Sequence, residues 1–230
     1  MRIVFCLPGR YYSGHFLMSM IELTQRFAKE GIEFAISQKY SSVVYYARNM
    51  CLGGNNLMGE KQLPWQGSLK YDYMLWIDSD ISFLSDQVFS LIETVKAYPT
   101  EIDILSGTYL MENRTQYATV IEWDIEFFKK FGTFKFMSTD DVKALDKSQL
   151  LSVAYTGFGF MMVKEGVFES IGYPWFRPLW EEIELDNGII AKDFTSEDVG
   201  FCRMATEKGY DILVDLNVNV GHEKIQVIKE

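Results

Sequence analysis

The first half of the chain alternates short apolar runs with segments of helical spacing, and this alternation restricts the fold more than any other feature. Continuous apolar runs predict buried strands at Ile3–Leu7, Ile32–Ile36, Tyr73–Ile77 and Ile102–Leu105. Apolar residues three or four positions apart predict helices over 14–30, from Ser41 or Ser42 to Gly53, and over 85–98. Strands that alternate with helices form right-handed βαβ units. We therefore expect an α/β fold with a mainly parallel central sheet flanked by helices.

The second half has shorter strand-like stretches and more irregular segments. The pattern predicts strands at 119–123, 133–137, 150–155, 158–163 and 212–214, and helices over 165–171 and 196–208. The acidic pair Asp140-Asp141 reads as a linker, and residues 173–193 lack periodicity, which indicates a functional loop. We expect a mixed, loop-rich C-terminal half within one domain.

Charge and cysteine content restrict the partners and the compartment. The chain has 22 Lys+Arg and 32 Asp+Glu, so its net charge is 22 − 32 = −10. Nucleic-acid binding depends on basic side chains, so we expect no nucleic-acid partner. Cys6, Cys51 and Cys202 are widely spaced, which predicts buried thiols in a reducing compartment. Without a signal peptide, or an apolar run near the ~18 residues of a membrane span, we expect a cytoplasmic protein with no membrane anchor.

Asp78-Ser79-Asp80 directly follows the most strand-like segment of the chain. Ligands of open α/β sheets bind at the carboxyl ends of the strands. Two carboxylates at that edge repel each other unless a proton or a cation lies between them, and a divalent cation would also bridge this acidic chain to a diphosphate. Carboxylates suit Mg²⁺ or Mn²⁺, and an imidazole ligand favours Mn²⁺. The alternative is that Asp78 and Asp80 are turn and cap residues.

Several stretches, in their order along the chain, resemble the GT-A class of nucleotide-sugar glycosyltransferases. They are YYARNMCL at 45–52, YDYMLWIDSDISF at 71–83, DILSGTY at 103–109, TGFGFMMVKEGVFESIG at 156–172, SEDVGFCRMATEKGY at 196–210 and VNVGH at 218–222. The order and spacing are similar to phage and viral members, and the region from Arg48 to Asp80 is similar to the Anp1-type mannosyltransferases. The resemblance implies a single GT-A (Rossmann-like) domain over 1–230. Its nucleotide-sugar-binding half would be 1–110, and its acceptor-binding and catalytic half 111–230.

The resemblance also implies a metal site. Asp78 and Asp80 match the D-x-D motif that holds the metal and the diphosphate and ribose of the donor, with Ser79 between them. His222 matches the late histidine that completes the metal shell in many such enzymes. The only other histidine is His15, inside the first predicted helix. The alternative for His222 is a solvated residue near the end of the chain.

Glu197-Asp198 matches the Glu-Asp pair of inverting members, in which the aspartate is the general base. Both residues lie in the first turn of a helix that Ser196 caps, where the helix dipole favours negative charge. A carboxylate kept ionised there can accept a proton from a sugar hydroxyl. Acidic residues in a first turn are also ordinary helix design, which is the alternative. We expect catalysis at Asp198, with Glu197 beside it.

The loop Pro8-Gly9-Arg10-Tyr11-Tyr12 leaves the first strand at the same edge of the sheet. In the family this loop holds the nucleotide base, so Tyr11 or Tyr12 can stack on uracil or guanine. Arg10 and Arg48 are candidate phosphate contacts, because a guanidinium fits phosphate oxygens. The alternative for each arginine is a surface charge.

Two further features point to ligands. Gly157 and Gly159 interrupt an apolar strand, which indicates a backbone that approaches a ligand or packs against Phe158 and Phe160. The acceptor is expected in the irregular segment that contains Trp175, Trp180, Glu181 and Glu182, since sugars present apolar faces to rings and hydroxyls to carboxylates.

The expected function is metal-dependent transfer of a hexose from a UDP- or GDP-sugar to an acceptor hydroxyl of a glycan or glycoconjugate, with Mn²⁺ or Mg²⁺ as cofactor. One alternative is an aspartate-nucleophile phosphohydrolase, whose signature is also an apolar strand followed by D-x-D. The other is a metal-dependent carbohydrate-binding module without turnover.

Overall fold

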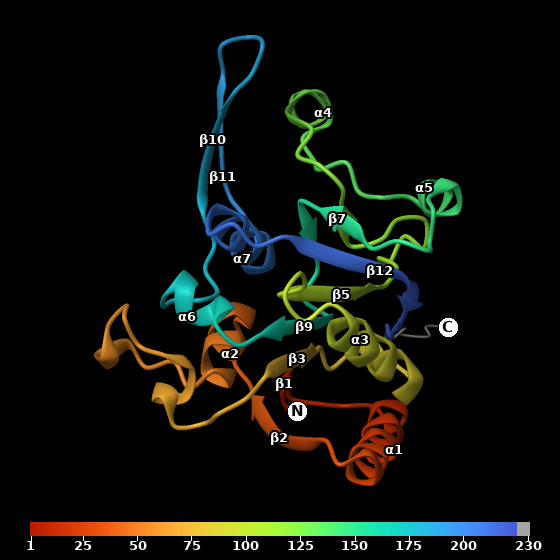
Figure 1. Ribbon diagram of the computed structural model, residues 1–230. Helices are drawn as coiled ribbons and strands as arrows, with labels where there is room; N and C mark the ends of the chain where they lie inside the picture. Colours follow the sequence, from red (N-terminus) through yellow and green to blue (C-terminus); the bar gives the residue numbers. More distant parts are fainter. Residues whose placement is uncertain (225–230) are drawn as a thin grey trace, which may run out of the picture.

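The computed structural model describes residues 1–224, which form a seven-stranded central sheet flanked by helices (Figure 1). In order across the sheet, the strands are β2 (Glu33–Lys39), β1 (Arg2–Pro8), β3 (Tyr73–Ile77), β9 (Phe160–Lys164), β5 (Ile104–Thr108), β12 (Ile212–Asn219) and β7 (Leu151–Val153). Five strands share one direction, and β9 and β7 run against them. The expected mainly parallel α/β fold is confirmed.

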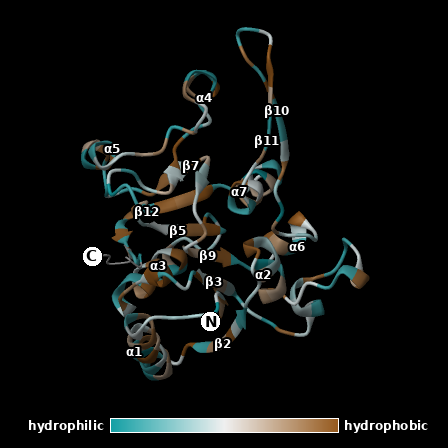
Figure 2. Ribbon diagram, turned by 180° about the vertical axis from the view of Figure 1, so that it is seen from behind, coloured by the Kyte–Doolittle hydropathy of each residue, from teal (hydrophilic) through white to brown (hydrophobic). Residues whose placement is uncertain are grey.

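Helices cover both faces of the sheet. On one face lie α1 (Gly14–Glu30) and α3 (Ser85–Ala97), and on the other α2 (Val44–Cys51), α6 (Val167–Ile171) and α7 (Glu197–Glu207). Alternate residues of the inner strands β1, β3, β9 and β5 contribute to one or the other of two buried apolar clusters, so the sheet has a core on each side. Figure 2 shows the hydrophobic residues gathered on β3, β9, β5 and β12, between these helix layers.

The first half folds as the pattern predicts because local signals and tertiary packing agree. The Ser13 hydroxyl accepts a hydrogen bond from the Phe16 N–H at 3.0 Å and so caps α1, and Gly31 ends the helix at φ 66°. The four apolar residues at helical spacing, Phe16, Met20, Leu23 and Phe27, are all buried. In α2, by contrast, Val44 and Met50 are exposed, and no side chain of Ser41 or Ser42 caps the helix.

The second half differs from the sequence expectation in several elements. Residues 133–137 form no strand, and the strand expected at 119–123 shrinks to β6 (Thr119–Val120), which pairs with β8 (Tyr155–Thr156). Two helices were not predicted, α4 (Ile125–Phe131) and α5 (Thr139–Ala144). Asp140-Asp141 is therefore no linker: both residues lie in the first turn of α5, where Asp141 and Ser138 bond reciprocally.

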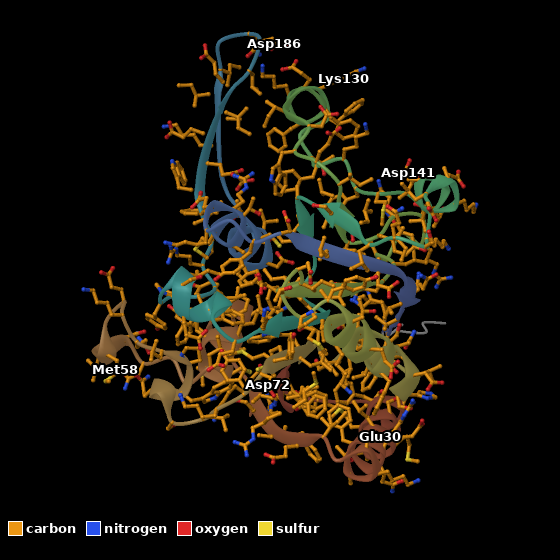
Figure 3. The ribbon with its side chains drawn as sticks, in the orientation of Figure 1. Glu30, Met58, Asp72, Lys130, Asp141 and Asp186 are labelled. Carbon is orange, nitrogen blue, oxygen red and sulfur yellow. The ribbon has the colours of Figure 1, made fainter. Side chains whose placement is uncertain are left out.

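The segment 173–193, expected to be a loop, contains most of an antiparallel hairpin. It consists of β10 (Trp180–Glu184) and β11 (Ile190–Phe194) and projects away from the central sheet (Figure 1). Figure 3 shows Asp186 at its tip and Lys130 on the neighbouring α4. A second small ladder joins β4 (Ile81–Ser82) to β13 (Gly221–His222). Two short 3₁₀ turns, Asn56–Met58 and Pro64–Gly67, occupy the connection between α2 and β3.

Two sequence expectations concern the chain's environment. All three cysteines are buried and free, as expected. Among residues 1–224, no helix is both long enough and apolar enough to cross a membrane.

Gly157 and Gly159 are needed for packing against Tyr109, which the sequence did not indicate. A Cβ at Gly157 would overlap the Tyr109 hydroxyl, and one at Gly159 would lie 2.8 Å from the Tyr109 ring. We predict that Gly157→Ala lowers the free energy of unfolding by about 1–3 kcal/mol, because the buried Tyr109 has to shift. Urea denaturation measures this. Gly14→Ala is the control, since its Cβ meets nothing within 4 Å. Equal effects of the two substitutions would contradict the prediction.

Candidate active site

The candidate site lies where β1 and β3 end, at the edge of the sheet that their carboxyl ends share. Asp78, Ser79 and Asp80 follow β3, and the loop after β1 packs directly on them. A Cβ at Gly9 would come within 2.7 Å of the Ser79 Oγ, so only glycine permits this close approach. The loop Pro8–Tyr12 and the D-x-D segment therefore form one continuous surface.

Arg48 connects Asp78 with Glu197 inside the protein. Its guanidinium donates to both oxygens of Asp78, each at 2.9 Å, and its Nε donates to Glu197 Oε1 at 3.1 Å. Arg48 is only 3% exposed. The rings of Trp76, Phe158 and Phe176 surround it, with centroids 5.2–5.9 Å from the guanidinium carbon. A bidentate fork plus one further bond uses most of the donors of this side chain.

These three charges depend on one another. Burial lowers the pKa of Arg48, but the Asp78 and Glu197 carboxylates outweigh it and the net pKa is raised, so the guanidinium stays charged. Burial raises the pKa values of Asp78 and Glu197, and Arg48 offsets only part of each shift. The sequence predicted that Arg48 contacts phosphate. In the described residues its polar partners are instead the carboxylates of Asp78 and Glu197.

Asp80 meets His222, which is 142 residues away in sequence. The β4–β13 ladder pairs His222 with Ile81, the residue after Asp80, and so brings the imidazole to the D-x-D segment. His222 Nε2 lies 3.1 Å from Asp80 Oδ2, and Lys224 Nζ lies 2.8 Å from the same oxygen. On the other side of the ring, Nδ1 lies 2.9 Å from the Leu110 carbonyl oxygen.

The contact with Leu110 determines which nitrogen of His222 carries hydrogen. A carbonyl only accepts, so Nδ1 is the donor and a neutral ring directs the Nε2 lone pair toward Asp80. Because the Asp80 carboxylate also offers only lone pairs, this arrangement needs a proton or a cation between the two groups. The hydrogen bond with Asp80 raises the pKa of His222 accordingly. Burial raises the pKa of Asp80, but hydrogen bonds from His222 and Lys224 outweigh it and lower the pKa to about 2.

The ligand atoms of Asp80 and His222 suit a divalent cation whose other coordination positions are filled by substrate or water. A carboxylate oxygen and an imidazole nitrogen, whose other nitrogen is anchored to a carbonyl, are a common pair of metal ligands. Within residues 1–224, no group of three or more His, Cys, Asp or Glu side chains can hold a metal. Asp78 is directed to Arg48 instead. A two-ligand site fits Mn²⁺ or Mg²⁺, which are often completed by substrate phosphates and water.

A cavity of about 540 Å³ adjoins His222. Its lining includes His222 and Lys224 with Leu110, Glu112 and Arg114. It gives the His222 side of the site open space lined by the cationic Arg114 and Lys224 and the anionic Glu112.

Asp198 lies in the first turn of α7, and its carboxylate is held from both sides. The Tyr155 hydroxyl donates to Oδ2 at 2.9 Å, and the Val199 N–H lies 2.9 Å from Oδ1. Ser196 precedes the helix as expected, but its hydroxyl donates to Asp198 Oδ1 rather than accepting from a helix N–H. Burial raises the pKa of Tyr155, so its hydroxyl remains a donor. Asp198 is close enough to Arg48 to contribute to its raised pKa.

The two tyrosines of the first loop lie in different environments. Tyr11 is 74% exposed, and the guanidinium carbon of Arg10 lies 5.1 Å from its ring centroid. Tyr12 packs its ring on Phe16 and donates its hydroxyl to the Leu7 carbonyl oxygen at 2.8 Å. Only Tyr11 therefore presents a free ring.

The residues expected to contact the sugar acceptor lie in different environments. Trp175 is fully buried, so the expectation that it contacts an acceptor is wrong: its ring belongs to the core. Glu181 forms an ion pair with Arg203, and Glu182 pairs with Lys192 at 3.1 Å. Trp180 is exposed on the hairpin. His15 is exposed on α1.

Sequence reasoning missed three side chains of this region. Tyr155 and Lys224 carried no motif, and nothing in the pattern could have found them. Tyr40 could have been found, because it directly follows a strand that ends at the same edge. Its ring centroid lies 5.5 Å from the Arg10 guanidinium carbon.

Comparisons with known proteins give similarities in structure only. No protein-family model and no curated protein sequence matches the chain. Among solved structures, the chain is similar to the catalytic domain of Drosophila beta1,4-galactosyltransferase 7 in complex with xylobiose (TM-score 0.48, 13% identity, 97% of this chain and 71% of that chain). It is also similar to glucosyl-3-phosphoglycerate synthase from Mycobacterium tuberculosis in complex with Mn²⁺, UDP and phosphoglyceric acid (TM-score 0.48, 12% identity, 97% and 71%). Neither activity is transferred to this chain at these values.

We predict that Arg48→Met lowers the free energy of unfolding by about 3–5 kcal/mol, because it leaves the buried Glu197 and the partly buried Asp78 without their cation. The variant should become more stable as the pH falls, since the folded chain then takes up protons at Asp78 and Glu197 more readily than the unfolded chain. Denaturation at several pH values measures both effects. Lys143→Met is the control: Lys143 and its partner Asp140 are solvent-exposed, and the expected loss is about 0.5 kcal/mol or less. An Arg48→Met variant no less stable than this control would contradict the prediction.

Proposed function

We propose that this chain is a metal-dependent glycosyltransferase of the GT-A class, which moves a hexose from a UDP- or GDP-sugar to a hydroxyl of a glycan or glycoconjugate. The contact between Asp80 and His222 carries the proposal. Two residues 142 positions apart meet where the sheet's strands end, in an arrangement that needs a proton or a cation between them. The resemblance of the motifs to this class, including its phage and viral members, supports the same conclusion.

In this proposal, Asp80 and His222 hold Mn²⁺ or Mg²⁺. When bound there, the cation would neutralise the diphosphate and stabilise the charge that develops on it as the sugar departs. The Leu110 carbonyl keeps the His222 ring in orientation through Nδ1. Ser79 and the backbone of Pro8 and Gly9 shape the floor on which the donor lies.

The exposed end of the first loop suits the nucleoside. The free Tyr11 ring can stack on the base, and Arg10 beside it can contact a phosphate. Arg48 is too buried for this role, so it acts through Asp78, whose side chain is 25% exposed. Residues 1–110 thus supply the donor half of a single domain, and 111–230 the acceptor half.

Asp198 is proposed as the general base of an inverting displacement. It takes the proton from the acceptor hydroxyl as that oxygen bonds to the sugar C1 and the C1–O bond to the diphosphate breaks. Tyr155 and Ser196 orient the carboxylate. Glu197 holds Arg48 and thereby fixes the first turn of α7, in which Asp198 lies.

Of the alternatives, the phosphohydrolase fits these contacts less well. Its nucleophile would be the first aspartate of D-x-D, but both oxygens of Asp78 accept from Arg48. A carbohydrate-binding module differs by having no turnover, which an activity assay decides. The cytoplasmic location expected from the sequence remains part of the proposal.

A thermal-shift screen of UDP- and GDP-sugars with and without Mn²⁺ tests the proposal. One of these donors should raise the melting temperature in the presence of Mn²⁺, because a ligand specific for the folded state stabilises it. Mn²⁺ alone should bind weakly, since the protein supplies only two ligands. In Asp80→Ala the donor-dependent shift should disappear while the fold persists. Asp140→Ala, which removes an 86% exposed carboxylate, is the matched control.

The accompanying assay is release of nucleoside diphosphate from the donor that binds. Slow Mn²⁺-dependent release supports a glycosyltransferase. Cleavage of a generic phosphate monoester with no release from any donor would favour the phosphohydrolase, and binding without release the carbohydrate-binding module. An unchanged donor shift in Asp80→Ala would refute the metal site.

We predict that Asp198→Asn keeps the donor affinity but lowers the transfer rate by about 10²–10⁴-fold, because the amide cannot accept the acceptor's proton. Calorimetric titration of the donor with Mn²⁺ and the rate of transfer to acceptor measure the two quantities separately. Asp140→Asn should change neither. Full turnover in Asp198→Asn would show that another group takes the proton.

A further inference from the structure

Strand β2 forms an edge of the central sheet, and within residues 1–224 it pairs only with β1 (Figure 1). The Glu33 N–H donates to the Met1 carbonyl oxygen, and the Lys39 carbonyl accepts from the Gly9 N–H. The odd-numbered residues of β2 therefore direct their backbone groups to β1, and the even-numbered ones direct theirs outward. The outward residues are Phe34, Ile36 and Gln38. Such a row of free groups is a template for a further strand.

The side chains near this edge are apolar and exposed. Phe34 and Ile36 are 39% and 51% exposed. They lie on the same face of the sheet as α1, because the Phe27 ring of α1 contacts both Phe5 on β1 and Phe34 on β2, with centroids 5.4 and 6.1 Å apart. The free edge therefore adjoins α1, whose C-terminal residue Glu30 is labelled in Figure 3.

One side of α1 extends this apolar surface. Arg26 and Ser19 face α3 and the segment before it, through contacts with Asp86 and with the Phe83 carbonyl oxygen. At 3.6 residues per turn, the side of α1 away from α3 carries Leu17, Ile21, Thr24 and Ala28. Leu17 and Ile21 are 57% and 40% exposed.

We propose that two copies of this chain associate through β2, in antiparallel pairing about a two-fold axis at Ile36. In this register Ile36 faces Ile36 of the second copy, and Phe34 faces Gln38. Outward-directed backbone groups then meet outward-directed groups, as an antiparallel ladder requires. At both ends Glu33 lies opposite Lys39 of the second copy, which pairs unlike charges.

The register is specified by the sequence of β2. A shift by one residue would place outward-directed groups opposite inward-directed ones. A shift by two would keep the ladder but separate Glu33 from Lys39 at both ends. The strand is thus most complementary to itself in one alignment, which is the requirement for a two-fold interface.

The second copy also accounts for the exposed side of α1. Strands lie about 4.8 Å apart, so helices that each cover β1 and β2 would come about 10 Å from each other across the axis, the usual packing distance. Leu17, Ile21 and Phe34 of both copies would then leave water. An unrelated peptide on the edge would satisfy the backbone groups but not these side chains.

Sedimentation velocity of the full chain, from micromolar to near-millimolar concentration, tests the proposal. We expect a monomer–dimer equilibrium, weakened about tenfold or more by Ile36→Lys, since this residue lies on the axis and is replaced in both copies. Ile189→Lys, a substitution of a 58% exposed side chain in the β10–β11 hairpin, which lies far from β2 (Figure 1), should leave the equilibrium unchanged. A monomer at every concentration, or a dimer insensitive to Ile36→Lys, would overturn the proposal.

Charge reversal tests the register with little risk to the fold. Lys39→Glu alone places like charges at both ends and should weaken the dimer about 5–30-fold. Glu33→Lys should do the same, although Glu33 also bonds Arg2 within the chain. The double variant should bind more tightly than either single variant. A double variant no tighter than the single ones would overturn the antiparallel pairing.

Discussion

The candidate site depends on one buried arginine side chain, that of Arg48. The guanidinium of Arg48 joins the end of β3, through Asp78, to the start of α7, through Glu197. A guanidinium removed from water is costly unless each charge has a partner in good geometry, and here the bidentate fork, the third bond and the surrounding rings supply it. Glu197 is buried and Asp78 is partly buried, so both carboxylates depend on Arg48 to compensate their charge. The segment that carries Asp80 and the helix turn that carries Asp198 are therefore held in relation to each other by electrostatics as well as by packing.

The sequence predicted the first half of the fold well because its main strands and helices bury apolar residues in regular patterns. The strand over Tyr73–Ile77 is buried on both faces and reads as a continuous apolar run, and α1 buries a single stripe. The second half lacks such signals. No residue of β10 or β11 is buried, and the half-buried positions of β10 carry Glu181 as well as Ile183, so the sequence shows neither an apolar alternation nor an apolar run. The two-residue strands β4, β6, β8 and β13 are too short to have a pattern at all.

The sequence predicted the positions of the candidate residues that follow a strand in a recognisable motif. It did not predict the contacts of side chains that can bind either a ligand or another residue of the protein. Asp78 and Asp80 follow from their position after β3, and the resemblance identified His222. Nothing local shows that Arg48 is buried against carboxylates rather than exposed to phosphate, because an arginine on a short helix fits both roles. Trp175 was assigned to an acceptor on composition, yet an aromatic residue in an aromatic-rich chain is more readily explained as core.

The two aspartates of the D-x-D segment, two positions apart, are in opposite electrostatic conditions. Burial raises the pKa of Asp78, and its permanent partner Arg48 cannot leave. The pKa of Asp80 falls to about 2 because hydrogen bonds from His222 and Lys224 outweigh its burial, and the Lys224 side chain is 41% exposed. Neighbouring carboxyls that are shifted in opposite directions take different roles. Asp78 is held by Arg48, whereas Asp80 keeps an ionised oxygen beside the Lys224 ammonium, which in the proposed function a divalent cation would replace. In the proposed function, such a site would bind its metal and its donor together, because the two protein ligands alone would hold the metal weakly and the acidic chain alone would repel the diphosphate.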